Sequence, residues 1–194
     1  MTSTPFAAGS DFAARDRQEH LLITDAELMR VTQNYRTPRG QVAIDAGCGS
    51  GAFTRQLARF GFHVTGIDIA DAALAAARRT PLPGVRYQRH DLNTGDPPGL
   101  PARGVDLVVC RLVLPLLHNP SQWVRHVRDH WLSPGGRLYL VLPLADPGTE
   151  QPGRLPAQQV AELSHGWAGF ARYDLRGALT ALMLRAAGPD SAAQ

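Results

Sequence analysis

A glycine-rich turn between a short apolar run and a helical segment constrains this chain more than any other feature. The run Gln41–Asp45 is apolar enough for a buried parallel strand, and Ala52–Phe60 has the spacing of a helix that Gly61 ends. Glycine permits backbone angles and close approaches that a Cβ forbids, and a helix N-terminus presents unpaired N–H groups. This arrangement predicts a ligand site at residues 47–51, whose sequence is Gly-Cys-Gly-Ser-Gly.

Short apolar runs and helical segments alternate after this turn. A strand is expected at each apolar run and a helix between successive strands, because parallel strands need crossover connections. The alternation predicts an α/β fold, with a mostly parallel sheet covered by helices on both faces. The further strands expected are His63–Ile67, Val85–Arg89, Val105–Cys110 and Arg137–Leu142, and the further helices are Asp71–Arg79, Pro120–Trp131 and Ala157–His165.

Some segments interrupt this alternation. Clusters of Pro and Gly mark loops and turns, and one of them stands where a crossover helix could have been. Two apolar runs near the end predict a hairpin, which makes the last strand of the sheet antiparallel. The first residue of the second helix, Asp71, is expected to cap it. The loops and turns are Gly95–Gly104, Ser133–Gly136 and Pro143–Pro156, and the hairpin is Phe170–Leu175 with Ala178–Leu184 about Gly177.

Length and composition fit one globular domain. The 194 residues are 44% hydrophobic and 19% charged. Residues 1–36 include an amphipathic segment that we expect to form a helical lid, residues 37–187 the ligand-binding domain, and residues 188–194 a disordered tail. The sequence has neither the pattern of a secretory signal nor that of a membrane span, so a cytoplasmic location is expected. Both cysteines, Cys48 and Cys110, are expected to be reduced.

The charge pattern permits contact with nucleic acid but does not demand it, and we expect a small-molecule acceptor as the partner, with no membrane contact and nucleic acid not favoured. The formal net charge is +3, and the 20 Lys and Arg positions are all arginines spread thinly along the chain. No spacing typical of metal ligands is recognised, so no metal is expected. We expect a monomer or a homodimer.

Acidic residues stand at the ends of three expected strands. Asp45 ends the first strand, Asp68 follows the second strand roughly 20 residues later, and Asp91 follows the third. The carboxyl ends of parallel strands meet at one edge of a sheet, where Asp68 could accept both ribose hydroxyls of a nucleoside. Asp45 would repel a pyrophosphate at the glycine turn but could pair with the ammonium of a zwitterion. The spacing therefore favours a nucleoside with an amino-acid end over a dinucleotide.

Four motifs occur in order along the chain, namely Val42–Gly51, Gly66–Ala70, His90–Leu92 and Leu132–Gly136. Together they resemble class I S-adenosylmethionine-dependent methyltransferases of the ubiquinone-biosynthesis-like type, from about residue 38 to residue 185. The resemblance implies a Rossmann-like, seven-stranded sheet of order 3-2-1-4-5-7-6. It also implies transfer of a methyl group from S-adenosylmethionine to an acceptor, which leaves S-adenosylhomocysteine.

The resemblance also implies roles for individual residues around the cofactor. The glycine turn would line the methionine end, and Asp68 would bind the ribose. Ile69 would cover one face of the adenine, while Asp91 and Leu92 would lie at its amino edge. The turn residues concerned are Asp45, Gly47, Cys48, Gly49 and Gly51.

A catalytic base is not evident in the sequence. Many relatives have a histidine pair after the fourth strand, where this chain has Pro115 and Leu116. A thiolate, phenolate or neutral amine needs no base to accept a methyl group, because the sulfonium is already activated. Cys110 and Arg111 match the positions that the family places near the sulfonium and the acceptor. The residues left open for a catalytic role are His20, Tyr35, Arg111 and His118.

Three functions stay open on the sequence alone. The first is methyl transfer to an O, N, S or C atom of a small organic acceptor, in natural-product biosynthesis. The second is RNA methylation, which predicts an Asn-Pro-Pro-aromatic motif after the fourth strand, where this chain has Cys110–Val113. The third is a protein that binds S-adenosylmethionine without transferring the methyl group.

Overall fold

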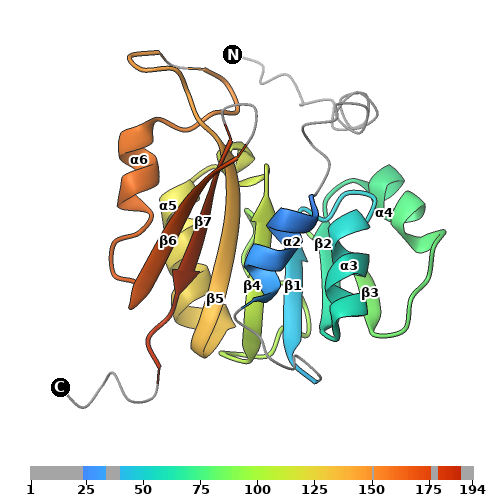
Figure 1. The fold of residues 1–194 in the computed structure, drawn as a ribbon. Helices are drawn as coiled ribbons and strands as arrows, with labels where there is room; N and C mark the ends of the chain where they lie inside the picture. The colour runs from blue at the N-terminus through green and yellow to red at the C-terminus, as the bar shows by residue number, and fades with distance from the viewer. Residues whose placement is uncertain (1–23, 34–39, 150, 176–178, 189–194) are drawn as a thin grey trace.

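A computed structural model describes residues 24–33, 40–149, 151–175 and 179–188 of the chain. Its centre is a seven-stranded sheet of order β3-β2-β1-β4-β5-β7-β6, so the expected sheet order is confirmed (Figure 1). Strand β7 runs antiparallel to both β5 and β6, as expected of the terminal hairpin. The strands are β1 (Val42–Ala46), β2 (His63–Asp68), β3 (Val85–Arg89), β4 (Val105–Arg111), β5 (Leu132–Pro143), β6 (Gly169–Leu175) and β7 (Leu179–Arg185).

Helices lie on both faces of this sheet. In Figure 1, α2 and α3 lie in front of the sheet and α5 and α6 lie behind it. The expected Pro120–Trp131 helix is present as an α-helix that continues into a short π-helix, and residues 95–104 contain no helix, as expected. The helices of the described residues are α2 (Asp25–Thr32), α3 (Ala52–Phe60), α4 (Asp71–Arg78), α5 (Pro120–His126), the π-helix η3 (Val127–Trp131) and α6 (Ala157–Glu162), together with the 3-10 turn η2 (Leu114–Leu116).

The core has one layer on each face of the sheet, and β4 contributes to both layers. Val108 and Cys110 of β4 belong to the layer that includes Trp123 of α5. Leu107 and Val109 alternate with them and belong to the layer that includes Phe53 of α3. Side chains of a strand point alternately to its two faces, so a central strand buried on both sides is apolar throughout. This explains the continuous apolar run Leu107–Cys110 within β4.

The prediction that Asp71 caps helix α4 is wrong. The N-cap position is Ala70, and Asp71 is already the first helical residue, one position too late to cap. The Asp71 carboxylate lies 3.2 Å from Arg89 Nε on the surface instead. The Ala70 N–H donates to Asp68 Oδ1 over 2.9 Å, so Asp68 supplies the local hydrogen bond at this helix start.

Strand β5 is longer than the sequence predicted, and α6 is shorter. The expected turn Ser133–Gly136 is part of β5, which begins at Leu132 with an irregular register against β4. Hydrogen bonds from Gly135 N to Ala187 O and from Ala186 N to Gly136 O hold this segment beside the end of β7. The last helix ends at Glu162 rather than at His165. Gly177 and residues 189–194 lie outside the described part of the chain.

Helix α2 is the described part of the expected N-terminal lid. Its first turn is capped by Thr24, whose side chain accepts from Glu27 N over 3.1 Å. Val31 is fully buried in the core layer that also holds Phe53 of α3. This helix therefore lies on a face of the sheet, while residues 1–23 and 34–36 fall outside the described residues. The lid itself stays a prediction.

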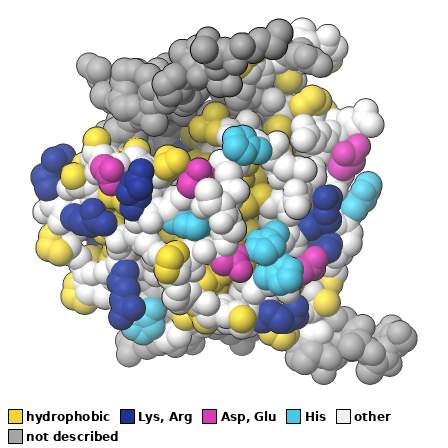
Figure 2. Space-filling model, turned by 180° about the vertical axis from the view of Figure 1, so that it is seen from behind, with side chains coloured by type: hydrophobic (Ala, Val, Ile, Leu, Met, Phe, Trp, Pro, Cys, Tyr) yellow, Lys and Arg dark blue, Asp and Glu magenta, His cyan; other side chains and the backbone are white. Residues whose placement is uncertain are grey.

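Asp96 fastens the loop that replaces a crossover helix. Its Oδ1 lies 2.6 Å from His126 Nε2 and accepts from Trp131 Nε1 over 2.6 Å. Burial would raise the pKa of Asp96, but the hydrogen bonds from His126 and Trp131 outweigh it and lower that pKa. Figure 2 shows histidine and acidic side chains gathered on this face. The loop thus gains a fixed position without a helix of its own.

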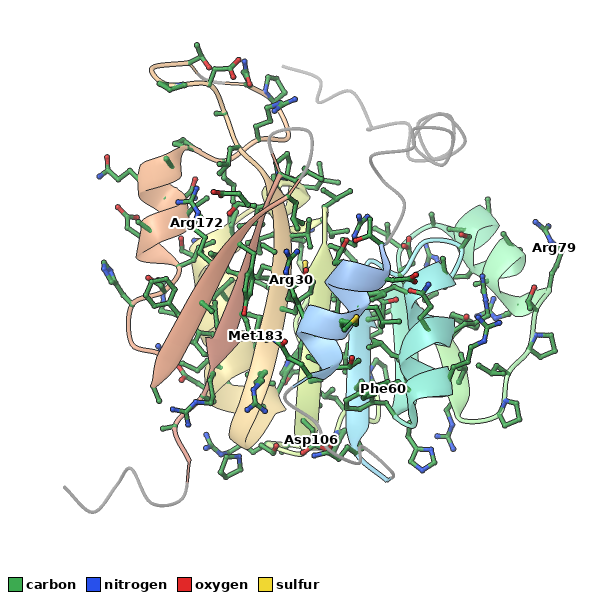
Figure 3. The ribbon with its side chains drawn as sticks, in the orientation of Figure 1. Arg30, Phe60, Arg79, Asp106, Arg172 and Met183 are labelled. Atoms are coloured by element: carbon green, nitrogen blue, oxygen red, sulfur yellow. The ribbon has the colours of Figure 1, made fainter. Side chains whose placement is uncertain are left out.

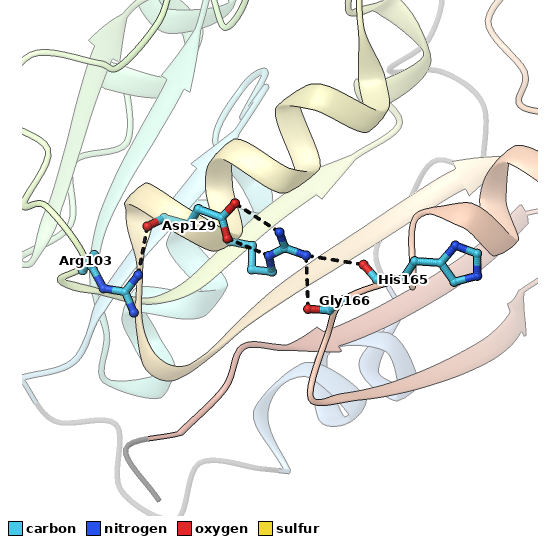
Figure 4. A network of polar contacts seen from close by, with 5 residues as sticks. Arg103, Asp129, His165 and Gly166 are labelled. Atoms are coloured by element: carbon cyan, nitrogen blue, oxygen red, sulfur yellow. Dashed lines mark hydrogen bonds and ion pairs between the residues drawn. The ribbon is translucent and has the colours of Figure 1, made fainter. Parts of the chain in front are cut away.

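Arg128 joins the π-helix to the segment that follows α6. Its guanidinium donates to Asp129 through Nε over 2.7 Å, and to the Gly166 carbonyl through Nη1 over 3.1 Å (Figure 4).

At the lower end of the sheet, Asp106 accepts from Val42 N over 2.9 Å and from the Ser133 hydroxyl over 3.0 Å (Figure 3). Both sets of contacts act as structural ties.

Within the described residues, no helix combines the length and the apolar character that a membrane crossing requires.

Candidate functional site

The candidate site lies at the carboxyl edge of the parallel strands. Register pairs Ala46 with Ile67 of β2 and with Cys110 of β4, so the ends of these three strands are level. The acids Asp45 and Asp68 stand on neighbouring strand ends, and Asp91 follows β3. The expectation that these acids gather at one edge is confirmed, and ligands of open α/β sheets bind at such an edge.

The glycine turn is held tightly against β2 and the loop after β4. Gly47 N and Cys48 N donate to the Ile67 carbonyl over 2.8 and 2.9 Å. Gly47, Gly49 and Gly51 have φ angles of +77°, +55° and +75°, which favour glycine. A Cβ on Gly47 would collide with the Val113 side chain. The turn therefore needs glycine both for its backbone angles and for close packing.

Replacing Gly47 by alanine tests the close packing separately from the backbone angle. Gly99 has a φ of +76° but no heavy atom within 4 Å of an added Cβ, so Gly99→Ala is the matched control. Both variants bear the cost of a left-handed alanine, and only Gly47→Ala adds overpacking against Val113. We expect Gly47→Ala to lose about 1–3 kcal/mol more unfolding free energy than Gly99→Ala in urea titrations. Equal losses would show that the loop that contains Val113 can move away from the added methyl group without a measurable cost in stability.

Tyr87 of β3 forms the other wall of the turn. A Cβ on Gly51 would collide with the Tyr87 hydroxyl, and one on Gly66 would lie 2.8 Å from its ring. Burial raises the pKa of Tyr87, although Arg55 Nη1 donates to its hydroxyl over 3.4 Å. The sequence analysis missed Tyr87, because nothing local marks a tyrosine in a strand as a neighbour of a turn two strands away.

Asp45 is a buried acid beneath the glycine turn. Only 2% of the residue is exposed, and the Thr54 hydroxyl donates to its Oδ2 over 2.6 Å. The pKa of Asp45 is raised to about 6: burial is the main cause and the nearby Asp68 adds to it, whereas the Thr54 hydrogen bonds and Arg111 act in the opposite direction. Thr54 was not among the expected site residues. An acid with its pKa near neutrality, beneath a glycine-rich turn at the edge of a sheet, is a candidate functional group.

Asp68 orders the backbone of the glycine turn and of the start of α4. Its Oδ2 accepts from Gly49 N over 2.8 Å, and its Oδ1 accepts from Ala70 N over 2.9 Å. A carboxylate has about four lone-pair sites, so these two bonds leave capacity for a ligand hydroxyl. The adjacent Ile69 is 48% exposed despite its large apolar side chain. An exposed apolar side chain beside an acid suits the flat face of a heterocycle.

Asp91 and Leu92 begin the loop after β3. Leu92 is buried in the core layer that includes Cys110, whereas Asp91 is only partly buried. Asp91 Oδ1 accepts from both the backbone and the side-chain nitrogen of Asn93, each over 2.9 Å. Asp91 therefore has a structural part in the loop as well as a position at the site edge.

Both cysteines are buried and neither resembles a nucleophile. Burial, with a smaller contribution from Asp45, raises the pKa of Cys48 far above its usual value and that of Cys110 to about 12. At neutral pH both are thiols. Cys48 is a residue of the glycine turn, and Cys110 lies in the core layer that includes Trp123.

Arg111 ends β4 and is held by an acid from the N-terminal helix. Its Nε donates to Glu27 Oε1 over 2.8 Å and its Nη2 to Glu27 Oε2 over 3.3 Å. The side chains of Arg111 and Glu27 are only 11% and 3% exposed. The structure thus shows Arg111 in a buried ion pair, and Glu27 is a residue that the sequence analysis missed.

The remaining catalytic candidates are less favourably placed. His118 is exposed, and its backbone N–H donates to Asn93 Oδ1 over 2.9 Å. His20 and Tyr35 lie outside the described residues. Among the described residues, no group of three or more His, Cys, Asp or Glu side chains is arranged to hold a metal.

Comparisons with known proteins agree with this geometry. Residues 44–138 match the sequence model of a family described as a methyltransferase domain. The chain is 31% identical over 102 residues to the ubiquinone biosynthesis O-methyltransferase of Aeromonas salmonicida, covering 52% of this chain and 42% of that protein. It is 33% identical over 104 residues to the enzyme of the same description from Xanthomonas axonopodis pv. citri, covering 53% and 43%. The chain thus matches less than half the length of these two relatives.

A solved structure matches over a larger part of the fold. The S-adenosylmethionine-dependent methyltransferase from Mesorhizobium loti has a TM-score of 0.66 at 21% identity, covering 82% of this chain and 97% of that one. At this identity the likeness concerns the fold. The sheet order, the matched methyltransferase domain, the O-methyltransferase relatives and the shared fold together support a class I S-adenosylmethionine-dependent methyltransferase.

Proposed function

We propose that this chain binds S-adenosylmethionine at the carboxyl edge of its sheet and transfers the methyl group to a small organic acceptor. The observation that carries the proposal is the buried Asp45 carboxylate beneath a turn in which Gly47 and Gly51 leave no room for a Cβ. A cationic ammonium compensates such a carboxylate, whereas a pyrophosphate would be repelled by it. S-adenosylmethionine has an ammonium on its amino-acid end.

The other residues along the edge fit the rest of this cofactor. Asp68 would accept the ribose hydroxyls with the lone pairs not used by Gly49 and Ala70. The exposed Ile69 would cover the adenine, and Asp91 would accept from its amino group. When bound, the cofactor supplies a methyl group on a sulfonium that needs no further activation. The protein then has to position the acceptor and exclude water.

The acceptor atom that we propose is an oxygen that ionises readily, such as a phenol. The named relatives are O-methyltransferases, which supports an oxygen acceptor. A phenolate needs no base, which fits a site edge where His118 is exposed and Arg111 is engaged by Glu27. A place in a biosynthetic route, including natural-product biosynthesis, is part of this proposal.

Calorimetry and a transfer assay together test the proposed function. We expect S-adenosylhomocysteine to bind with micromolar affinity and the dinucleotide NAD to show no binding, because Asp45 repels a pyrophosphate. Methyl-labelled S-adenosylmethionine should then label members of a panel of phenols. Tighter binding of NAD would contradict the cofactor assignment. Binding of S-adenosylhomocysteine with no labelling of phenols, amines or thiols would favour a protein that binds the cofactor without transfer.

A further inference from the structure

Asn93 connects two loops at the candidate adenine end of the site. Its Nδ2 donates to Asp91 Oδ1 over 2.9 Å, and its own backbone N–H donates to the same oxygen over 2.9 Å. Its Oδ1 accepts from His118 N over 2.9 Å, in the loop that follows β4. Only one orientation of the amide satisfies both contacts, because the carboxylate needs a donor and the N–H needs an acceptor.

These contacts leave the two oxygens of Asp91 unequal. Oδ1 receives two N–H donors from Asn93, and this fixes the rotation of the carboxylate. The turn below is closed separately, because Thr94 donates its N–H and its hydroxyl to the Asp91 carbonyl over 3.0 and 2.8 Å. Oδ2 is therefore the carboxylate oxygen that has capacity for a ligand donor.

We propose that Asn93 is a positioning residue that makes the site selective for a 6-aminopurine. This inference rests on the proposed function and adds the residue that sets its purine preference. A carboxylate oxygen held in place accepts a hydrogen bond from a 6-amino group, but it faces the oxygen of a 6-oxopurine unfavourably. Replacing the Asn93 side chain leaves the backbone N–H as the only donor from residue 93 to Asp91 Oδ1, so the carboxylate is less firmly oriented, and the loop loses its tie to His118. The preference for the amino group then weakens more than the fold does.

The test compares two ligands that differ only at this position of the purine. Calorimetry measures the dissociation constants of S-adenosylhomocysteine and its 6-oxo counterpart, S-inosylhomocysteine, for the full chain and its variants. We expect Asn93→Ala to reduce the ratio of the two constants by about tenfold or more. Asn93→Asp keeps an acceptor for His118 N but loses the donor to Asp91, so it should reduce the ratio as well.

Thr94→Val is the matched control, because it removes a hydrogen bond in the same turn that does not reach the carboxylate. It should keep the ratio of the unsubstituted chain, and melting curves should show that every variant folds. An unchanged ratio in both Asn93 variants, with a selective parent protein, would overturn this inference and leave the proposed function intact. A parent protein that does not bind S-adenosylhomocysteine would overturn the proposed function and this inference with it.

Discussion

Glu27→Gln is expected to lower the free energy of unfolding by about 3–5 kcal/mol. Glu27 and Arg111 form a two-point ion pair whose side chains are 3% and 11% exposed. The variant keeps the shape of the side chain but leaves the Arg111 charge buried beside a neutral amide. A buried charge that loses its partner costs far more than a surface ion pair contributes.

Urea denaturation with a matched exposed variant measures this effect. Glu162→Gln makes the same chemical change at an exposed position of α6 and should shift the unfolding free energy by less than about 0.5 kcal/mol. The double variant Glu27→Gln/Arg111→Met should lose less than the two single variants combined, because it removes both charges. Strictly additive losses would contradict a coupled buried pair.

The ion pair between Glu27 and Arg111 also links helix α2 to the glycine turn. Arg111 is followed by Leu112, whose φ of +63° is unusual for a residue other than glycine, and then by Val113, which packs on Gly47. Loosening Arg111 therefore loosens the wall of the turn. We expect Glu27→Gln to bind S-adenosylhomocysteine more weakly under conditions in which it is still folded.

Asp45→Asn is expected to abolish most cofactor affinity without destabilising the protein at pH 8. Removing one partner of a buried charge pair costs about 2–5 kcal/mol of binding free energy, which is a loss of at least 30-fold or so. The amide oxygen of asparagine can still accept from the Thr54 hydroxyl, so the local hydrogen bond is kept. The loss should therefore appear in binding and not in folding.

The effect of pH on stability follows from the direction of the Asp45 shift. Its pKa rises from 3.8 to about 6 in the folded chain, so the folded state binds this proton more tightly than the unfolded state does. The stabilisation is complete below pH 3.8 and is lost as the pH rises to about 6. The wild-type carboxylate then costs about 3 kcal/mol above that pH, and Asp45→Asn removes this cost.

Two measurements check the role of Asp45. Unfolding free energies at pH 5 and pH 8 should show that Asp45→Asn gains relative to wild type at the higher pH, whereas the exposed control Asp174→Asn does not. Wild-type affinity for S-adenosylhomocysteine should fall below pH 6, because a protonated Asp45 cannot pair with the ammonium. Affinity that is independent of pH in this range would argue against contact between Asp45 and the cofactor.

The sheet order was predicted from the resemblance to a known family, whereas the residue pattern alone was sufficient to predict the alternating strands and helices, the position of the glycine turn and the acids along one edge. These features depend on local patterns, because a strand buried on both faces is a continuous apolar run and a left-handed turn needs glycine. Leu107–Cys110 and Gly47–Gly51 are examples. Residues that follow parallel strands meet at one edge whatever the details of packing, so Asp45 and Asp68 could be placed together before the structure was known.

Only the tertiary structure revealed which side chains act on these residues. Thr54 on Asp45, Glu27 on Arg111 and Asn93 on His118 are contacts between different elements, and no local pattern marks them. The early start of β5 also depends on a contact between distant segments. Gly135 and Gly136 are held in the sheet by hydrogen bonds with Ala187 and Ala186, which follow β7. Local sequence determines which backbone shapes are accessible, whereas burial and partners depend on residues that meet only when the chain has folded.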